Sequence, residues 1–313
     1  MKLIKPKFWD YKKPNFLSYL LLPFTFPIII NNFFIRLRKN QKKDKRIKTI
    51  CVGNIYIGGT AKTPLSIKLD QILNKLNFKS AVIKKFYKKQ KDEQKLLSNK
   101  SKLYCFSKRK IALREAIKDS IDIAVFDDGL QDGSINYDLR FVCFNNIKWI
   151  GNGLLIPAGP LRNNIQSIKD YDVIFLNGNQ ENNTNIKKII REYNKNILIF
   201  DTYYRPTNIY KFDNKERYLI FSGIGNPDIF KETLIRNNLN VVKEFKFPDH
   251  YHYTGKDIKN IKLYAQNLNA KILTTEKDYI KLSKDNSDEI EFLQIEMVIE
   301  KEDELVNFIR LNI

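Results

Sequence analysis

The sequence predicts an α/β protein with a mostly parallel, doubly wound sheet that carries helices on both faces, plus a smaller C-terminal α/β lobe. Two observations support this fold class. Short apolar runs alternate with helical stretches after residue 48, and a glycine-rich loop separates the first run from the first helix. Strand-helix alternation is typical of parallel sheets, because the connections between parallel strands are usually helical. The chain has 313 residues, of which 43% are hydrophobic, which is enough for two lobes.

The strands of the first lobe are expected where short apolar runs are bounded by turn residues. These runs cover 49–53, 81–83, 103–106, 121–126, 141–144, 173–176 and 197–200. A helix is expected over 64–76, because its leucines and isoleucine recur at helical spacing and Pro64 lies in the first turn, where proline is tolerated.

A second block begins near Arg217. Strands are expected over 218–221, 241–245, 271–273 and 292–298, and helices over 227–238, over 256–267 and from Glu302. Arg205, Pro206 and Thr207 interrupt the pattern, so we place the lobe boundary in this region. The expected organisation is an N-terminal segment over 1–45, a core over 46–208 and a C-terminal lobe over 209–313.

The N-terminal segment contains an uncharged run from Phe16 to Ile35, long enough to span a bilayer. Pro23 and Pro27 argue against a straight transmembrane helix, because proline removes a helical hydrogen bond. Basic residues flank the run on both sides: Lys12, Lys13, Arg36, Arg38 and Lys39. This pattern favours a segment that lies in the membrane interface. A true span and a helix buried against the protein remain alternatives.

The composition limits the classes of partner and cofactor. A formal charge of +20 suits nucleotides, phospholipid head groups or phosphorylated substrates, although a solvated basic surface explains it equally well. No RNP-type motif or zinc-finger spacing is present, so we expect no nucleic-acid partner. Cys51, Cys105 and Cys143 are typical of buried thiols in a reducing compartment. With only His250 and His252, a multi-histidine metal site is excluded.

The strongest local motif lies between the first strand and the first helix and reads Gly58-Gly59-Thr60-Ala61-Lys62-Thr63. Small residues let backbone N–H groups wrap phosphate oxygens, a lysine neutralises their charge and a threonine hydroxyl can bind Mg²⁺. Tyr56 stands where the strict phosphate-loop pattern has its first glycine. Ala61 before Lys62 costs little unless its φ is positive. The alternative is a glycine-rich turn with an incidental lysine.

The second motif is an apolar strand that ends in Asp127-Asp128-Gly129. Ligands of open α/β sheets bind at the carboxyl ends of the strands, and phosphoryl transfer needs carboxylates there to hold Mg²⁺. Together with Lys62 and Thr63 the pair favours a metal site, and a plain turn is the alternative. We expect Lys62 and Thr63 to face these acids across a bound triphosphate.

Two further segments carry candidate residues. Asp249-His250-Tyr251 follows Phe247-Pro248, and a histidine beside a carboxylate can accept a proton near neutral pH. A purely structural histidine is the alternative. The segment 151–162, rich in glycine and proline, ends in Arg162, which is able to hold a phosphate with two hydrogen bonds.

These segments, in this order, resemble the tetraacyldisaccharide 4′-kinase (lipid A 4′-kinase) family. The matching motifs are Val-Gly-Asn-x-x-x-Gly-Gly-Thr-x-Lys-Thr-Pro (52–64), Phe-Asp-Asp-Gly-Leu-Gln (126–131), Leu-Ile-Pro-Ala-Gly-Pro-Leu-Arg (155–162), Phe-Ser-Gly-Ile-Gly (221–225), Phe-Pro-Asp-His-Tyr (247–251) and Leu-Thr-Thr-Glu-Lys-Asp (273–278). The N-terminal Leu-Leu-Pro-Phe (21–24) also matches. The resemblance covers nearly the whole chain.

The resemblance implies a P-loop NTPase-like fold and a kinase that uses ATP and Mg²⁺. The implied substrate is a tetraacyldisaccharide 1-phosphate, whose 4′-hydroxyl is phosphorylated to give lipid IVA in lipid A biosynthesis. The enzyme is then expected on the cytoplasmic face of the inner membrane, as a peripheral or monotopic protein. We expect a monomer.

The resemblance also implies roles for individual residues. The loop from Gly58 to Thr63 would bind ATP, with Lys62 on the β- and γ-phosphates. Thr63, Asp127 and Asp128 would hold Mg²⁺. The catalytic residues would be Asp92, His250 and Lys62, with Asp92 taking the proton from the sugar hydroxyl. Substrate contacts are implied for Arg109, Arg162 and Asn54.

The chain departs from the family pattern at several positions. The segment before Asp92 is short, and the family's Ser-Arg-Gly-Tyr reads Lys84-Lys85-Phe86-Tyr87. Asp132 replaces a histidine, Asn163 replaces an acid and Ala61 replaces a loop glycine. Two rival functions remain: a membrane-associated P-loop switch or ATPase without a lipid substrate, and a non-enzymatic membrane protein with a decayed nucleotide site. No base-reading Asn-Lys-x-Asp motif of a GTPase is present.

Overall fold

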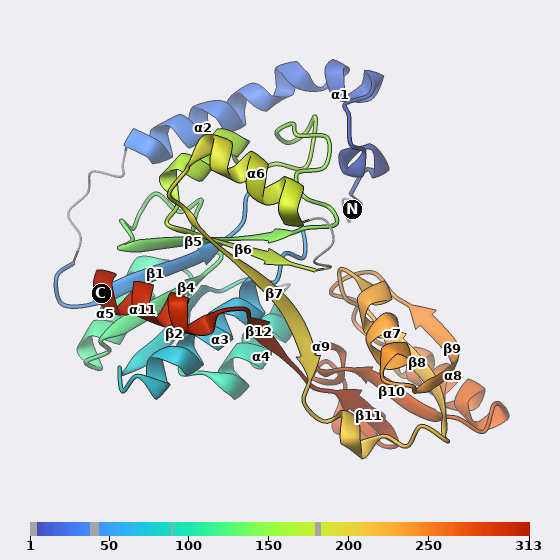
Figure 1. Cartoon of the computed structure of the whole chain (residues 1–313). Coiled ribbons are helices and arrows are strands. Elements are labelled where there is room, and N and C mark those ends of the chain that lie inside the picture. Colours follow the sequence, from blue (N-terminus) through green and yellow to red (C-terminus); the bar gives the residue numbers. More distant parts are fainter. Residues whose placement is uncertain (1–4, 38–43, 89, 179–182) are drawn as a thin grey trace. The chain divides into compact units, whose positions relative to one another are not determined.

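A computed structural model describes residues 5–37, 44–88, 90–178 and 183–313, and the chain divides into two compact units (Figure 1). Unit 1 comprises residues 1–85, 101–203 and 298–313, and unit 2 comprises 86–100 and 204–297. Two segments therefore differ from the expected division: the C-terminal stretch belongs to unit 1, and the stretch that carries Asp92 belongs to unit 2. The basic flank at Arg38 and Lys39 lies outside the described residues.

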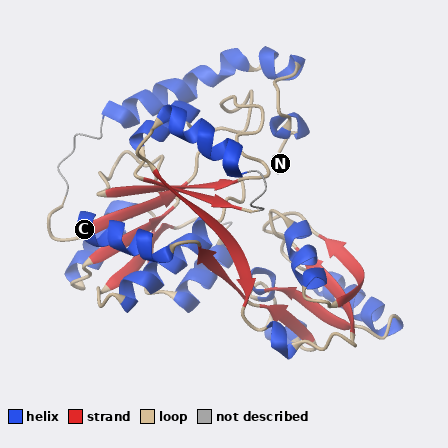
Figure 2. Cartoon of the chain, viewed as in Figure 1, coloured by secondary structure: helices blue, strands red, loops and turns tan. Residues whose placement is uncertain are grey.

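Unit 1 contains an eight-stranded sheet in the order β12-β7-β6-β5-β1-β4-β2-β3. Figure 2 shows the strands in red and the helices in blue. Every neighbouring pair from β3 to β7 is parallel. The strands are β1 (Lys48–Gly53), β2 (Ser80–Lys85), β3 (Leu103–Phe106), β4 (Ile123–Asp127), β5 (Leu139–Asn145), β6 (Val173–Asn177), β7 (Leu198–Pro206) and β12 (Ile295–Ile299). Strands β7 and β12 continue from unit 1 into unit 2. The parallel α/β sheet expected from the sequence is confirmed.

Helices cover both faces of this sheet. The α-helices of unit 1 are α1 (Phe16–Leu20), α2 (Phe26–Leu37), α3 (Lys62–Lys75), α5 (Arg109–Lys118), α6 (Asn183–Tyr193) and α11 (Glu302–Asn312). On β2, the Ser80 hydroxyl donates to Asp70 of α3 at 2.6 Å, whereas Ala81 packs in the same cluster as Ala112 of α5. Successive strand residues point to opposite faces, so α3 and α5 lie on opposite sides. The doubly wound arrangement places the carboxyl ends of β1 and β4 beside each other.

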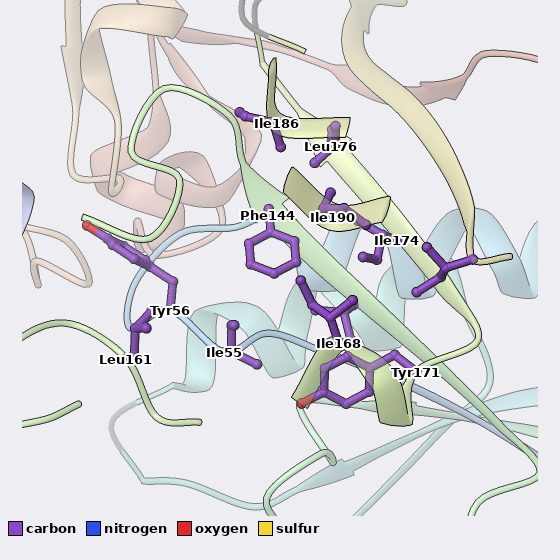
Figure 3. Packing of buried hydrophobic residues seen from close by; sticks show 12 residues of the cluster. Ile55, Tyr56, Phe144, Leu161, Ile168, Tyr171, Ile174, Leu176, Ile186 and Ile190 are labelled. Carbon is purple, nitrogen blue, oxygen red and sulfur yellow. The ribbon is translucent and has the colours of Figure 1, made fainter. Parts of the chain in front are cut away.

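One core cluster joins the sheet to the segment that follows β1 (Figure 3). Its buried residues come from β5, β6, α6, the 3₁₀ helix η4 (Ile165–Asp170) and the loops: Ile55, Tyr56, Val142, Phe144, Leu161, Ile168, Tyr171, Ile174, Leu176, Ile186, Ile190 and Ile197. Each large apolar side chain buried in this way contributes about 1.5–3 kcal/mol. Because Ile55 and Tyr56 belong to the cluster, the glycine-rich loop is anchored in the core at its first residues.

The N-terminal segment packs on unit 1 through the buried Trp9 and through polar contacts, and it leaves most of its other apolar side chains exposed. It consists of the 3₁₀ turns η1 (Lys7–Asp10) and η2 (Leu22–Thr25) with helices α1 and α2. Trp9 Nε1 donates to the carbonyl of Pro157 at 2.9 Å, and Asn32 Nδ2 donates to the carbonyl of Arg162 at 2.8 Å. None of the residues of α2 is buried. The alternative of a helix buried against the protein is therefore wrong for α2.

Unit 2 is a smaller α/β unit with a four-stranded sheet in the order β11-β10-β8-β9, in which every pair is parallel. Its elements are α4 (Lys91–Lys100), η6 (Ile209–Lys211), β8 (Arg217–Ser222), α7 (Pro227–Arg236), β9 (Asn240–Lys246), α8 (Gly255–Asn267), β10 (Lys271–Thr275), α9 (Glu276–Tyr279), α10 (Lys284–Ser287) and β11 (Ile290–Leu293). The single strand expected over 292–298 is wrong, because Gln294 separates β11 from β12 and these strands belong to different sheets.

Candidate active site

The loop between β1 and α3 is shaped by one buried asparagine. The Asn54 side chain is fully buried, and its Nδ2 donates to the carbonyl of Tyr56 at 2.6 Å, to the carbonyl of Gly58 at 3.3 Å and to Thr60 Oγ1 at 2.7 Å. The loop is therefore held in place before a ligand arrives. These contacts bind loop to loop, and substrate binding by Asn54 remains a prediction.

The loop reaches α3 through two residues with positive φ, Gly58 at 121° and Ala61 at 68°. The condition under which Ala61 becomes costly is therefore met, because a left-handed conformation brings Cβ close to backbone atoms. Ala61 precedes the first helical residue, Lys62, and has no side-chain oxygen to cap the helix. The first N–H groups of α3 have no intrahelical partners, and a helix N-terminus of this kind binds phosphate.

Lys62 and Thr63 face the acidic end of β4, as the sequence analysis expects. The Thr63 hydroxyl donates to Asp127 Oδ2 at 3.0 Å, and Lys62 Nζ lies 3.9 Å from Asp128 Oδ1. Asp127 is fully buried, and Asp128 adopts a φ of 58°. The turn at Asp128 directs the two carboxylates to different partners, so that one lies on the threonine and the other faces the lysine.

Lys84 is a buried cation in this site to which the sequence analysis gave no role. Its Nζ donates to Asp127 Oδ2 at 2.6 Å, and its side chain is 3% exposed. The residue lies near the end of β2, which pairs with β4 in parallel register with Lys84 opposite Asp127. A lysine in a strand whose other residues are mostly apolar was the available signal, because a buried ammonium group requires an acidic partner.

Two arginines complete the cation set around Asp128. Arg162 NH2 donates to Asp128 Oδ1 at 2.8 Å and to the Asn54 carbonyl at 3.2 Å. Arg109 is almost fully buried and donates to the Asp128 carbonyl at 2.5 Å and to Asp132 Oδ2 at 3.1 Å. Asp132, which replaces a histidine of the family pattern, therefore serves as the ion-pair partner of Arg109.

The electrostatics of Asp128 follow from these neighbours. Burial alone would raise the pKa of its carboxyl group. The charges of Lys62, Arg162 and Lys84, together with the hydrogen bond from Arg162, outweigh burial and hold that pKa well below its usual range. Asp128 is therefore ionised near neutral pH, which a role in metal or phosphate binding requires.

The residues of unit 1 fit a magnesium ion. Mg²⁺ prefers oxygen ligands, keeps several waters and is usually bound through one or two carboxylates plus substrate phosphates. The Thr63 hydroxyl and the Asp127 carboxylate are 3.0 Å apart and supply two such oxygens, and Asp128 supplies a third group beside Lys62. No cluster of three or more histidine, cysteine or acidic side chains suited to a metal occurs among the described residues. The donor set therefore suits an ion bound largely through nucleotide and water.

The second group of candidate residues lies within unit 2. His250 Nδ1 lies 3.0 Å and 3.1 Å from the two carboxylate oxygens of Asp92, which is in the first turn of α4. The side chain of Asp92 is 6% exposed and that of His250 is 28% exposed. Asp92 and His250 are thus brought together despite the short segment that precedes Asp92, and the histidine is the more accessible member of the pair.

Two lysines and the histidine determine the protonation of Asp92. Burial alone would raise its pKa, but the hydrogen bond from His250 and the charges of Lys277, His250 and Lys281 hold that pKa well below its usual range. Nζ of Lys277 and Nζ of Lys281 each lie 3.8 Å from Asp92 Oδ2. Neither lysine is assigned a role by its sequence pattern, although Lys277 belongs to the motif 273–278.

Comparison with known proteins identifies the family. The model of the family described as tetraacyldisaccharide-1-P 4′-kinase matches residues 16–313. The tetraacyldisaccharide 4′-kinase of Pelagibacter ubique (strain HTCC1062) is 51% identical over 314 residues, which cover 100% of this chain and 99% of that protein. The enzyme of the same name from Rickettsia bellii (strain OSU 85-389) is 33% identical over 322 residues, covering 96% and 95%.

The fold agrees with a solved structure. The crystal structure of LpxK from Aquifex aeolicus in complex with ATP matches with a TM-score of 0.70 at 23% sequence identity, covering 95% of this chain and 100% of that one. This likeness supports the fold, and the sequence matches establish the relationship. The chain therefore belongs to the tetraacyldisaccharide-1-phosphate 4′-kinase family.

Proposed function

We propose that this chain transfers the γ-phosphoryl group of ATP to the 4′-hydroxyl of a tetraacyldisaccharide 1-phosphate, giving lipid IVA. Family membership supports the reaction. The observation that carries the proposal is the arrangement at the start of α3, where Lys62 and Thr63 face Asp128 and Asp127. Phosphoryl transfer asks a protein mainly for positioning and charge neutralisation, and this arrangement provides both for a nucleoside triphosphate.

In the proposed reaction each group of unit 1 has a distinct task. The N–H groups of the loop and of the α3 N-terminus bind phosphate oxygens, and Lys62 neutralises charge at the β- and γ-phosphates. Thr63, Asp127 and Asp128 hold Mg²⁺, which supplies charge neutralisation of the phosphates when bound. Arg162 and Arg109 keep Asp128 oriented, and Arg162, which is partly exposed, is also placed to bind a substrate phosphate.

The Asp92–His250 pair is proposed to take the proton of the sugar hydroxyl. The oxygen–phosphorus bond to the sugar forms as the bond from the γ-phosphorus to the bridging oxygen breaks, and ADP leaves. The hydroxyl proton passes to the pair, with Asp92 as the acceptor and His250 as its partner. The ionised state of Asp92 supports this assignment, because a carboxylate must be unprotonated before it can accept a proton.

The N-terminal segment is proposed to hold the enzyme at a membrane surface. From residue 16 onward its exposed apolar side chains are Phe16, Leu17, Tyr19, Leu20, Leu22, Phe24, Phe26, Ile29, Ile30, Phe33, Phe34 and Leu37. Among the described residues, no helix has both the length and the apolarity needed to cross a bilayer. The acyl chains of the substrate lie in the same membrane, and a cytosolic ATP supply places the reaction at the cytoplasmic face. A peripheral or monotopic monomer is sufficient for this chemistry.

The function is tested by incubating the purified chain with ATP, Mg²⁺ and the tetraacyldisaccharide 1-phosphate in detergent micelles. We expect a bisphosphorylated lipid by mass spectrometry, and no product when Mg²⁺ is chelated. ATP hydrolysis without a lipid product would favour the switch or ATPase alternative. The absence of both ATP binding and turnover would favour a decayed site.

The Lys62→Ala variant tests the phosphate-loop assignment. We expect product formation to fall roughly 100-fold or more, because a preorganised positive group at the transferred phosphate is lost. The fold should persist, since the Lys62 side chain is partly exposed and its ammonium group lies 3.9 Å from Asp128, beyond hydrogen-bond distance. Lys68→Ala is the matched control, because this lysine lies on the same helix and pairs with Glu302 at 2.7 Å. Unchanged turnover of Lys62→Ala would refute the assignment.

A further inference from the structure

Lys277 lies in the middle of the acidic cluster that contains Asp92. Its Nζ is 3.2 Å from Asp249 Oδ1, 3.6 Å from Glu93 Oε1 and 3.8 Å from Asp92 Oδ2. Its side chain is 20% exposed. Three carboxylates from two separate segments of unit 2 therefore share one ammonium group.

The neighbouring cation, Lys281, has a different partner. Its Nζ donates to Asp278 Oδ1 at 2.7 Å and to the carbonyl of Gly223 at 3.2 Å, and it lies 3.8 Å from Asp92. Asp278 is fully buried and also accepts from the N–H of Gly223 at 3.0 Å and from the Tyr253 hydroxyl at 3.0 Å. Lys281 thus mainly neutralises a structural carboxylate, and Lys277 is the lysine that contacts all three carboxylates of the cluster at Asp92.

The need for this compensation follows from burial and like charge. An isolated buried carboxyl group tends to be neutral, and nearby carboxylates favour the neutral form further. Asp92 has both conditions: its side chain is 6% exposed, and Glu93 and Asp249 converge with it on the same ammonium group and on the His250 ring. A neutral Asp92 could neither accept a proton nor offer both oxygens to His250 Nδ1. The charged groups facing Asp92 are thus His250, Lys277 and Lys281, with Glu93 and Asp249 beside them.

We propose that Lys277 is a positioning residue of the phosphoryl-transfer step, which keeps Asp92 as a carboxylate oriented toward His250. The inference rests on the proposed function and adds a residue to it. Lys277 acts through Asp92 and transfers no proton itself. Lys277 itself stays protonated. Burial alone would lower the pKa of its ammonium group, but the charges of Asp249, Glu93 and Asp92 raise that pKa above the ordinary lysine value.

The test compares Lys277→Met, Lys277→Arg and Lys100→Met with the wild-type chain in the lipid kinase assay. For Lys277→Met we expect kcat to fall roughly 10-fold or more, because Asp92 loses a charged neighbour that holds it in the orientation needed for the reaction, while KM for ATP changes less than about 2-fold. Lys277→Arg keeps the charge and should recover most of kcat. Lys100 is the matched control: its Nζ pairs with Glu276 at 2.6 Å between the same helices, α4 and α9. Lys100→Met should keep wild-type kcat.

A double-mutant cycle with Asp92→Asn separates positioning from a general structural effect. If Lys277 acts through Asp92, adding Lys277→Met to Asp92→Asn lowers kcat no further than about 2-fold. The proposal is overturned if Lys277→Met has wild-type kcat, if the two losses multiply, or if Lys100→Met is equally impaired. Should Lys277→Met fail to fold by circular dichroism, Lys277→Gln replaces it in the same cycle.

The assay also separates failure of this inference from failure of the proposed function. A wild-type chain that forms no phosphorylated lipid, or an Asp92→Asn variant as active as wild type, overturns the function and this inference together. An active wild type, an impaired Asp92→Asn and a fully active Lys277→Met overturn the inference alone.

Discussion

Two residues, Ala61 and Lys84, distinguish the phosphate-binding site of this chain. Ala61 adopts a left-handed conformation at the position where the family pattern has glycine. Lys84 supplies an ammonium group to Asp127 from the end of a strand whose other residues are mostly apolar. The alanine therefore introduces local backbone strain into the site, and the lysine adds a buried ion pair to it.

The strain at Ala61 leads to a stability prediction. Ala61→Gly should raise the free energy of unfolding of unit 1 by roughly 1 kcal/mol, because glycine adopts a φ of 68° without the Cβ clash. Urea unfolding followed by the fluorescence of Trp9 and Trp149, both in unit 1, measures the change. Ala112→Gly in the middle of α5 is the control and should have the opposite sign. A less stable Ala61→Gly would contradict the strain argument.

At the scale of elements, the N-terminal helices leave most of their apolar side chains exposed. Phe16, Phe24 and Phe26 are 79%, 65% and 63% exposed. Burying a phenylalanine side chain contributes about 1.5–3 kcal/mol, so a dozen exposed apolar side chains on one segment represent a large potential gain at a lipid surface.

The membrane role predicts a specific loss. Replacing both Phe16 and Phe24 by Glu should weaken binding to vesicles that contain anionic phospholipid roughly 100-fold or more, by removing at least about 3 kcal/mol of apolar burial. Vesicle sedimentation measures the partition. Tyr210→Glu is the control, since Tyr210 is as exposed as Phe16 but belongs to unit 2. Binding that survives the double substitution would exclude these side chains as the membrane contact.

At the scale of the whole molecule, ionised carboxylates inside the two units make stability depend on pH. The folded-state pKa of Asp128 is lowered, so its stabilising contribution is fully present above its unfolded value, near pH 4, and is lost as the pH falls through the lower folded value. The urea midpoint of unit 1, followed by tryptophan fluorescence, should therefore stay level down to about pH 4 and fall as the pH is lowered further. Asp128→Asn should flatten this dependence, and a midpoint that rises with acidification would contradict it.

Much of the fold was predictable because its signals are local. The strand Leu103–Phe106 has the expected bounds, and the phosphate loop lies between the expected strand and helix. Three features could not be found this way. Helix α4 has one fully apolar buried position, Leu97, so periodicity does not reveal it. The run 290–299 contains no glycine or proline to mark a break, although its two strands join different sheets. The assignment of residues 86–100 and 298–313 depends on contacts distant in sequence.

The sequence predicted which motif residues meet at the phosphate-binding loop, but it did not predict which lysines pair with the buried acids. Lys62, Thr63, Asp127 and Asp128 meet as expected, because strand ends and helix starts converge at one edge of a parallel sheet. Lys277 and Lys84 went without a role because a lysine in a lysine-rich chain carries no signal by itself. Only the burial of their partners distinguishes them.

The attachment of the N-terminal segment bears on how the protein can be handled. The hydroxyl of Tyr56, in the loop that precedes the phosphate cradle, accepts a hydrogen bond from Lys5 and donates one to Asp10. Asn32 holds the carbonyl of Arg162, whose guanidinium group contacts Asp128. Deleting the apolar N-terminal segment to ease purification would therefore also remove contacts that hold the phosphate-binding loop in place. The ATP affinity measured on such a truncated protein would differ from that of the intact chain.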